Sequence, residues 1–243
     1  MDLKTALNAD GLVCVVGAGG KKSTLYTLAH RLDRAVVTAT VRIPIFDEYV
    51  ESVRVTDDPI DALSSVDEDD WPLGLVPEQE RSDRYRGYDR ETVAAIARDE
   101  AVETTLVKAD GARMRELKAP KENEPQIPKS ATVVLPIASV HAVGEPLTES
   151  VVHRPERVAA VTGLEPGETI RPEDIAATIA SEDGGMKDVP PDATVVPVLN
   201  KVDNSELAAT AREIAAEIHE RASISHVALT QMTGEQPLVD VIR

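Results

Sequence analysis

Short apolar runs alternate with amphipathic segments along the first forty residues. Residues 11–16 are apolar and rich in valine, a pattern typical of a buried parallel strand. After a glycine-rich turn, residues 23–32 place Leu25, Leu28 and other apolar side chains at helical spacing, which predicts an amphipathic helix. Residues 35–40 form a second apolar run. The pattern predicts a βαβ unit with a right-handed crossover.

The alternation continues to the far end of the chain. Further strands are expected at 104–109, 131–138, 194–199 and 225–229, and further helices at 92–98, 155–162, 172–180 and from Ser205 onward. The acidic stretch 57–90 is expected to be a surface excursion. Alternating strands and helices predict an α/β fold with a doubly wound, mainly parallel sheet. The length of 243 residues fits one such domain over 1–243.

The charge balance changes the expected environment. Asp and Glu number 43 against 26 Lys and Arg, for a net charge of −17, and only 2% of residues are aromatic. The acids are dispersed, so we expect a halophilic protein in a salty cytoplasm, where salt screens self-repulsion. The same acidity argues against nucleic acid as a partner, because phosphate neutralisation needs clustered cations.

No apolar run is long enough to span a bilayer, and Met1–Lys4 lacks the layout of a signal peptide. A cytoplasmic location without a membrane partner is therefore expected. The single cysteine, Cys14, lies inside the first apolar run and excludes an intrachain disulfide. It is expected to be a buried hydrophobic residue rather than a reactive thiol.

A phosphate-binding loop is the clearest chemical signal. Between the first strand and the first helix stand Gly17, Ala18, Gly19, Gly20, Lys21, Lys22, Ser23 and Thr24. Glycines let the backbone bring its N–H groups close to phosphate, and the positive helix end faces the anion. Lys21 can reach the terminal phosphates of ATP or GTP. The alternative is a tight strand-to-helix turn without a ligand.

The spacing of this loop departs from the standard G-x-x-x-x-G-K-[ST]. Only two residues separate Gly17 from Gly20, as in the loop of Mur-type ligases. Lys22 stands where a Mg²⁺-binding hydroxyl normally follows the lysine. Ser23 or Thr24 is therefore expected to take that role.

Two more motifs follow predicted strands. Asp110, with Gly111 behind it, ends the third long strand, where an Asp of a P-loop fold holds Mg²⁺ directly or through water; an ordinary strand-ending turn is the alternative. The run Asn200-Lys201-Val202-Asp203 matches the N-K-x-D pattern of GTPases. There Asp203 would read guanine, Lys201 would pack on the base and Asn200 would brace the loop. A polar turn with a capping Asp is the alternative.

Charged residues crowd the segment after Asp110, and prolines stiffen it. The charged members are Arg113, Arg115, Lys118 and Glu124, and Arg154 follows later in His153-Arg154-Pro155-Glu156. They are candidates to bind an anionic substrate or to switch with the nucleotide, since guanidinium pairs well with phosphate. A solvated surface loop is the alternative for the segment. For Arg154 the alternative is a helix start with proline in its first turn.

Taken together, these motifs resemble the YqeC family of putative selenium-dependent hydroxylase accessory proteins. The residues that carry the resemblance are Gly17 to Lys21, Thr38-x-Thr40, Asp110-Gly-Ala, Leu117-Lys118-Ala-Pro120, Glu124-Pro125-x-Ile-Pro128, His153 to Glu156 and Asn200-Lys-x-Asp203. They occur in order from about residue 11 to about residue 230. The resemblance implies a P-loop-like domain and a link to the maturation of molybdenum hydroxylases. Two residues depart from the family pattern: Lys22 stands where a small hydroxyl residue is usual, and Lys108 stands where Glu is usual.

Three functions are consistent with these residues. The first is a nucleotide-binding accessory protein that hydrolyses ATP or GTP slowly, with Lys21 and Asp110 as catalytic residues and Ser23 and Asp110 at Mg²⁺. The second is a small-molecule kinase or Mur-like ligase, in which Arg113, Arg115 and Lys118 hold the substrate. The third is a non-catalytic nucleotide sensor, favoured by the absence of an evident base to activate water.

Overall fold

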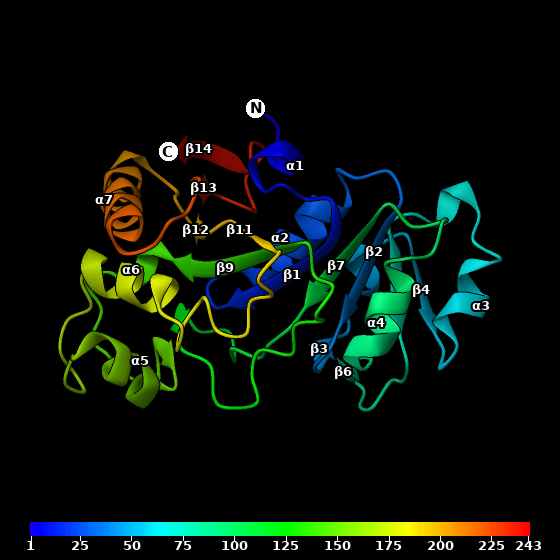
Figure 1. The fold of residues 1–243 in the computed structure, drawn as a ribbon, viewed down its shortest axis with the longest axis horizontal. Helices are drawn as coiled ribbons and strands as arrows, with labels where there is room; N and C mark the ends of the chain where they lie inside the picture. The colour runs from blue at the N-terminus through cyan, green and yellow to red at the C-terminus, as the bar shows by residue number, and fades with distance from the viewer.

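The computed structural model describes residues 1–243, whose main feature is a ten-stranded sheet (Figure 1). The strand order is β14-β13-β12-β9-β1-β7-β2-β5-β4, and β11 also pairs with β9. The strands are β1 Gly11–Gly17, β2 Ala35–Ala39, β4 Ser52–Val55, β5 Leu73–Val76, β7 Thr104–Lys108, β9 Val133–Ser139, β11 Thr194–Val195, β12 Val198–Asn200, β13 Val227–Thr230 and β14 Leu238–Ile242. All pairings are parallel except that of β13 with β14.

Helices lie on both faces of this sheet, which confirms the predicted doubly wound α/β fold. They are α1 Leu3–Ala6, α2 Lys21–Ala29, α3 Pro59–Leu63, α4 Arg90–Ile96, α5 Pro155–Thr162, α6 Pro172–Ala180 and α7 Ser205–Arg221. Two short two-stranded pairs lie outside the main sheet: β3 Ile43–Pro44 with β6 Arg84–Tyr85, and β8 Leu117–Lys118 with β10 Val152–His153.

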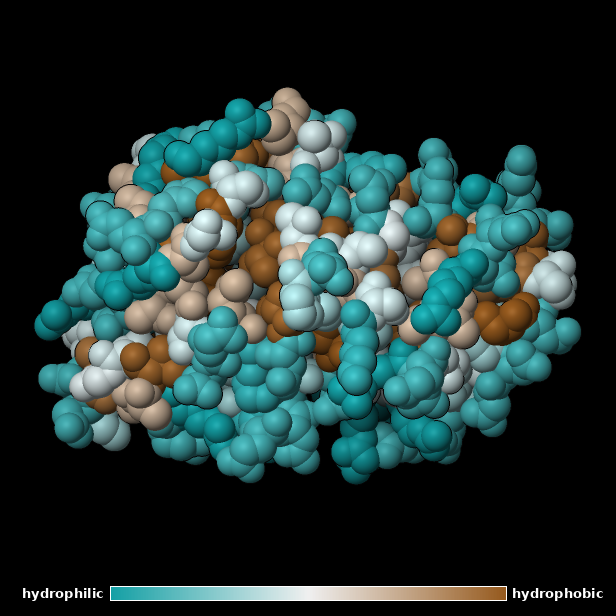
Figure 2. Space-filling model, viewed as in Figure 1, coloured by the Kyte–Doolittle hydropathy of each residue, from teal (hydrophilic) through white to brown (hydrophobic).

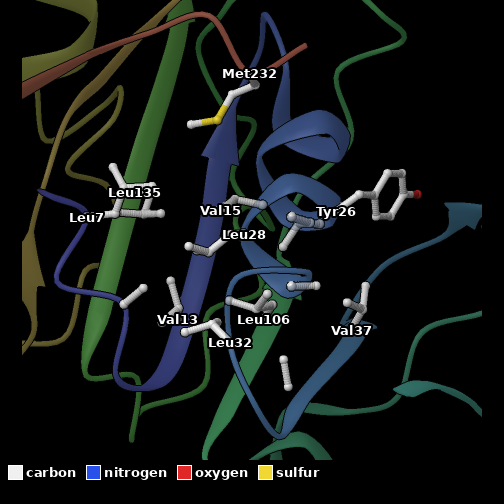
Figure 3. Close-up of a cluster of buried hydrophobic side chains, with 14 of the residues drawn as sticks. Leu7, Val13, Val15, Tyr26, Leu28, Leu32, Val37, Leu106, Leu135 and Met232 are labelled. Atoms are coloured by element: carbon white, nitrogen blue, oxygen red, sulfur yellow. The ribbon is translucent and has the colours of Figure 1, made fainter. Parts of the chain in front are cut away.

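The alternation of side chains along β1 separates the two faces. Val13 and Val15 belong to the core cluster that includes α2, whereas Cys14 belongs to the cluster that includes Val93 and Ile96 of α4. Figure 3 shows Val13 and Val15 beside the α2 side chains and beside Leu106 of β7. A third cluster joins β12 and β13 to α6 and α7. Cys14 is buried, as expected.

Three expectations are corrected. Residues 57–90 are not simply a surface excursion, because Leu73–Val76 form the fully buried strand β5 between β2 and β4. The predicted strand 194–199 is two strands, since Pro197 interrupts it and has no N–H for the sheet. Ser205, whose residue type suits a helix cap and so was expected to cap the last long helix, is instead the first residue of α7, and the cap is Asn204, whose side chain accepts the Leu207 N–H.

Hydrophilic side chains cover most of the face seen in Figure 2, which agrees with the acidic composition. None of the helices combines the length and the apolar character that crossing a membrane requires.

Candidate functional site

The glycine-rich loop lies at the carboxyl end of β1, where the direction of the crossover connections changes. From β1 the chain passes through α2 to β2, which lies on one side of β1 in the strand order. From β9 it passes through α5 and α6 to β12, which lies in the opposite direction along the strand order. Adjacent strands with crossovers in opposite directions form a topological switch point, where α/β proteins bind ligands. The loops after β1, β9 and β12 meet there.

Three glycines shape the loop. Gly17, Gly19 and Gly20 have φ of 86°, 81° and 136°, a region that L side chains rarely adopt. A Cβ on Gly20 would also collide with the side-chain amide of Asn200. The loop therefore needs glycine at this position both for its backbone angle and for the close approach of β12.

An account of the loop N–H groups shows which of them remain free for a ligand. The Gly17 N–H donates to Asp110 Oδ2 at 3.0 Å, the Ala18 N–H to the Ile137 carbonyl, and the Gly19 N–H to the Arg115 carbonyl. The N–H groups of Gly20, Lys22 and Ser23 have no acceptor in the protein. Free donors at a helix N-terminus attract anions.

Lys21 begins α2 and is buried against Asp110. Its Nζ lies 2.8 Å from Asp110 Oδ1, with side-chain exposures of 5% and 2%, and it also donates to the Gly17 carbonyl. Burial lowers the pKa of Lys21, and the charge of Asp110 opposes that shift. Burial alone would raise the pKa of Asp110, but Lys21 and Lys118 outweigh it and hold the pKa below its usual value.

A second buried lysine extends this cluster. Lys118 Nζ lies 2.7 Å from both Asp110 Oδ2 and Glu124 Oε2, and it donates to the Gly111 carbonyl at 2.5 Å. Arg154 Nη1 lies 2.8 Å from the same Glu124 oxygen. The structure thus brings the separately predicted Lys21, Asp110, Lys118, Glu124 and Arg154 into one chain of ion pairs. We call these five residues the buried ion-pair chain.

Arg154 stands at the helix start that the sequence offered as its alternative role, and its side chain forms an ion pair within the chain. It is the residue before Pro155 at the start of α5, with a left-handed φ of 66°, and its side chain reaches Glu124. The neighbouring His153 is buried on β10, and burial together with the charge of Arg154 lowers its pKa to about 4.

Sequence reasoning noted Lys108 only as a departure, but the structure places it beside this cluster. Lys108 is 7% exposed, and its Nζ donates to the Arg42 carbonyl at 2.7 Å. Burial, followed by the charge of Lys21, lowers its pKa to about 7. A charged residue in an otherwise apolar strand was the available signal for it.

The N-K-x-D segment contacts the phosphate loop through Asn200. Its Nδ2 donates to the Gly19 carbonyl at 2.9 Å, and its Oδ1 accepts from Thr230 Oγ1 and the Met232 N–H. Lys201 Nζ lies 2.7 Å from both carboxylate oxygens of Glu116. Sequence reasoning missed Glu116, Thr230 and Met232, because their partners lie on other loops.

The segment around Arg115 lies across the phosphate loop. The Arg115 carbonyl accepts the Gly19 N–H, and the Glu116 carbonyl accepts the Ser139 N–H at 3.0 Å. Arg113 has φ of 47° and an exposed side chain. Its side chain and that of Arg115 make no hydrogen bond or ion pair within the chain. We call residues 111–116 the ledge.

The donors for Mg²⁺ are fewer than in a standard loop. The hydroxyls of Ser23 and Thr24 both donate to the Gly20 carbonyl, at 2.7 and 3.0 Å. Thr24 is fully buried, so the half-buried Ser23 hydroxyl is the more accessible candidate. Asp110 Oδ1 accepts no hydrogen bond of good geometry and faces only the Lys21 charge. No cluster of three or more His, Cys, Asp or Glu side chains could hold a metal ion. Mg²⁺ here would need phosphate and water oxygens, as it commonly does.

Comparisons with known proteins agree with the sequence resemblance. Residues 13–156 match the family described as YqeC protein. The chain is 29% identical over 209 residues to the protein named "Uncharacterized protein YqeC" of Escherichia coli strain K12, an alignment that covers 84% of this chain and 80% of that protein. No solved structure matches the chain.

Proposed function

The chain belongs to the YqeC family, and on that premise we propose that it binds ATP or GTP with the phosphates on the loop from Gly17 to Lys21. The observation that carries the proposal is the set of free N–H groups on Gly20, Lys22 and Ser23 beside the Lys21 ammonium. Backbone donors, a helix N-terminus and a lysine are the groups that hold phosphates in such loops.

Phosphate binding would take Lys21 away from Asp110. The buried ion-pair chain holds three cations, Lys21, Lys118 and Arg154, against the carboxylates of Asp110 and Glu124. An arriving phosphate supplies the missing negative charge for Lys21, while Lys118 keeps Asp110 neutralised. Mg²⁺ would neutralise the phosphate oxygens, with the Ser23 hydroxyl and the released Oδ1 of Asp110 as its protein contacts.

Hydrolysis is proposed to be slow. The two carboxylates nearest Lys21, those of Asp110 and Glu124, are paired with cations, and their pKa values lie below the usual range. Neither is suited to take a proton from water. A slow NTPase fits the accessory role in molybdenum hydroxylase maturation that the family resemblance implies. The ledge, hydrogen-bonded to Gly19, is the element that would report the nucleotide to a partner.

The kinase or ligase alternative has weaker support. It assigns the substrate anion to Arg113, Arg115 and Lys118, but the Lys118 side chain is 0% exposed and already contacts three oxygens. A substrate would have to open the buried ion-pair chain to reach Lys118, which leaves only the two arginines to hold it.

A titration of thermal stability tests nucleotide binding. Mg²⁺-ATP or Mg²⁺-GTP at a hundred times its Kd adds about 2.7 kcal/mol, which raises the Tm of a domain of this size by several degrees. The rise should vanish in Lys21→Ala and persist in Lys129→Ala, which changes an exposed lysine outside the loop. If neither nucleotide raises the Tm of the native chain, the loop is only a structural turn.

A further inference from the structure

We propose that the nucleotide is a guanine nucleotide and that the carboxylate of Asp203 reads its base. This inference rests on the proposed function, because it identifies the base of the nucleotide whose phosphates lie on the loop. Three observations on the loops after β9 and β12 support it.

The first observation is that Asp203 is not the cap of α7, the structural role that the sequence had left open for it. A polar turn before a helix often needs an aspartate as cap. Here the cap of α7 is Asn204, whose Oδ1 accepts the Leu207 N–H at 2.9 Å. The Asp203 side chain is 39% exposed, and its partner is His141, whose Nε2 lies 3.0 Å from Oδ2. Asp203 is therefore not needed as the helix cap, and its Oδ1 makes no hydrogen bond or ion pair.

The second observation places Asp203 beside the phosphate loop. Asn200 ends β12 and is joined to the Gly19 carbonyl, so the turn that follows it must lie next to that loop. His141, two residues beyond the end of β9, has its Nε2 3.0 Å from Asp203 Oδ2. Since β9 is the neighbour of β1, the carboxylate lies near the switch point, at the end of the sheet where the phosphate loop lies.

The third observation concerns a surface for the base. Lys201 has a left-handed φ of 65°, and its ammonium is held by both oxygens of Glu116 on the ledge. Its aliphatic stem therefore runs from the end of β12 to the ledge, whose Arg115 carbonyl accepts the Gly19 N–H of the phosphate loop. Lysine stems cover flat apolar groups while the charged end stays paired elsewhere.

The chemistry of a carboxylate selects guanine over adenine. Guanine presents two adjacent donors, N1–H and the exocyclic amine, to the two oxygens of Asp203. Adenine presents the lone pair of N1 in the same direction, which a carboxylate repels. A site built to hydrogen-bond a donor rejects the analogue that lacks it, and we expect about a hundredfold preference at this partly exposed position.

Calorimetric titration in molar KCl with the Mg²⁺ complexes of GTP, ATP and XTP tests the assignment. The native chain should bind GTP about a hundredfold more tightly than ATP. Asp203→Asn should weaken GTP binding at least about tenfold and create XTP binding, because an amide can donate to the second carbonyl of xanthine while accepting N1–H. XTP binding by the variant would also show that it is folded.

Asp192→Asn is the matched control and should behave like the native chain. Asp192 is exposed, makes no ion pair and precedes β11 at the opposite edge of the sheet. Equal affinity of the native chain for ATP and GTP, or unchanged preferences in Asp203→Asn, would overturn the guanine assignment and leave nucleotide binding intact. Absence of binding by every triphosphate would overturn the proposed function and this inference with it.

Discussion

The side-chain amide of Asn200 donates to the carbonyl oxygen of Gly19 across 181 positions of sequence. Asn200 is 3% exposed, and its oxygen also accepts from Thr230 and Met232. One buried side chain therefore joins the phosphate loop to the ends of β12 and β13, and it sets the distance between the predicted phosphate and base positions.

Replacement of this residue should be costly. Asn200→Ala leaves the Gly19 carbonyl and the Met232 N–H without their partner, and we expect a loss of about 3 kcal/mol of unfolding free energy. Urea denaturation measures it. Asn204→Ala, which removes only a helix cap, should cost about 1 kcal/mol. Equal losses in the two variants would mean that the Asn200 contacts are not maintained in solution.

A pair of glycine variants separates backbone strain from crowding. Gly20 and Gly167 both have positive φ, but a Cβ meets the Asn200 amide at Gly20 and nothing within 4 Å at Gly167. Gly167→Ala should cost about 1 kcal/mol. Gly20→Ala should cost about 3 kcal/mol or more, because overpacking adds to the strain. Similar melting temperatures for the two variants would contradict the close approach of Asn200.

The buried ion-pair chain should depend on Lys118. Lys118→Met removes the cation that Asp110 and Glu124 share and leaves each carboxylate with one partner, Lys21 or Arg154, so we expect a loss of about 3 kcal/mol. Lys187→Met removes the pair with Asp188, whose side chain is 56% exposed, and should cost under about 1 kcal/mol. Denaturant midpoints of the two variants provide the comparison. A mild effect of Lys118→Met would show that water enters the cluster.

Lys108 should make stability depend on pH. Its pKa is about 7 in the folded chain, against about 10.4 in an unfolded one. Between these values the unfolded state binds more protons, so stability rises with pH by at most about 1.4 kcal/mol per unit. The gain is lost as pH falls toward 7. Urea titrations at pH 7, 8 and 9 give the unfolding free energy at each pH. This free energy should rise less steeply with pH in Lys108→Met than in the native chain. An equal rise in both would show that the Lys108 ammonium is in contact with water.

Salt should stabilise the native chain. A net charge of −17 repels itself, and the screening length falls from about 10 Å at 0.1 M to about 3 Å at 1 M salt. The Tm should therefore rise as KCl is increased to 2 M, by more than sucrose of equal osmolarity raises it. A Tm independent of KCl would remove the basis for a halophilic protein.

The sequence by itself determined most of the elements and the location of the candidate loop. The strands β1, β2, β7 and β9 and the helices α5 and α6 follow from apolar periodicity and from proline at the helix starts, which are local properties. The glycines between the first strand and the first helix predict a turn with positive φ angles, which is also a local property. The N-K-x-D pattern was sufficient to predict that the Asn200 side chain contacts a loop of the site.

Only the tertiary structure decided which charges meet and where the acidic region belongs. Lys118 shares Asp110 with Lys21, and Glu116 holds Lys201, because the strand order brings their loops to one edge of the sheet. Strand β5 lies inside the acidic stretch, and its four residues are too few for a reliable period. Pairings between distant segments depend on strand order, which local pattern does not encode, because the same apolar strand can pair with any neighbour of matching shape.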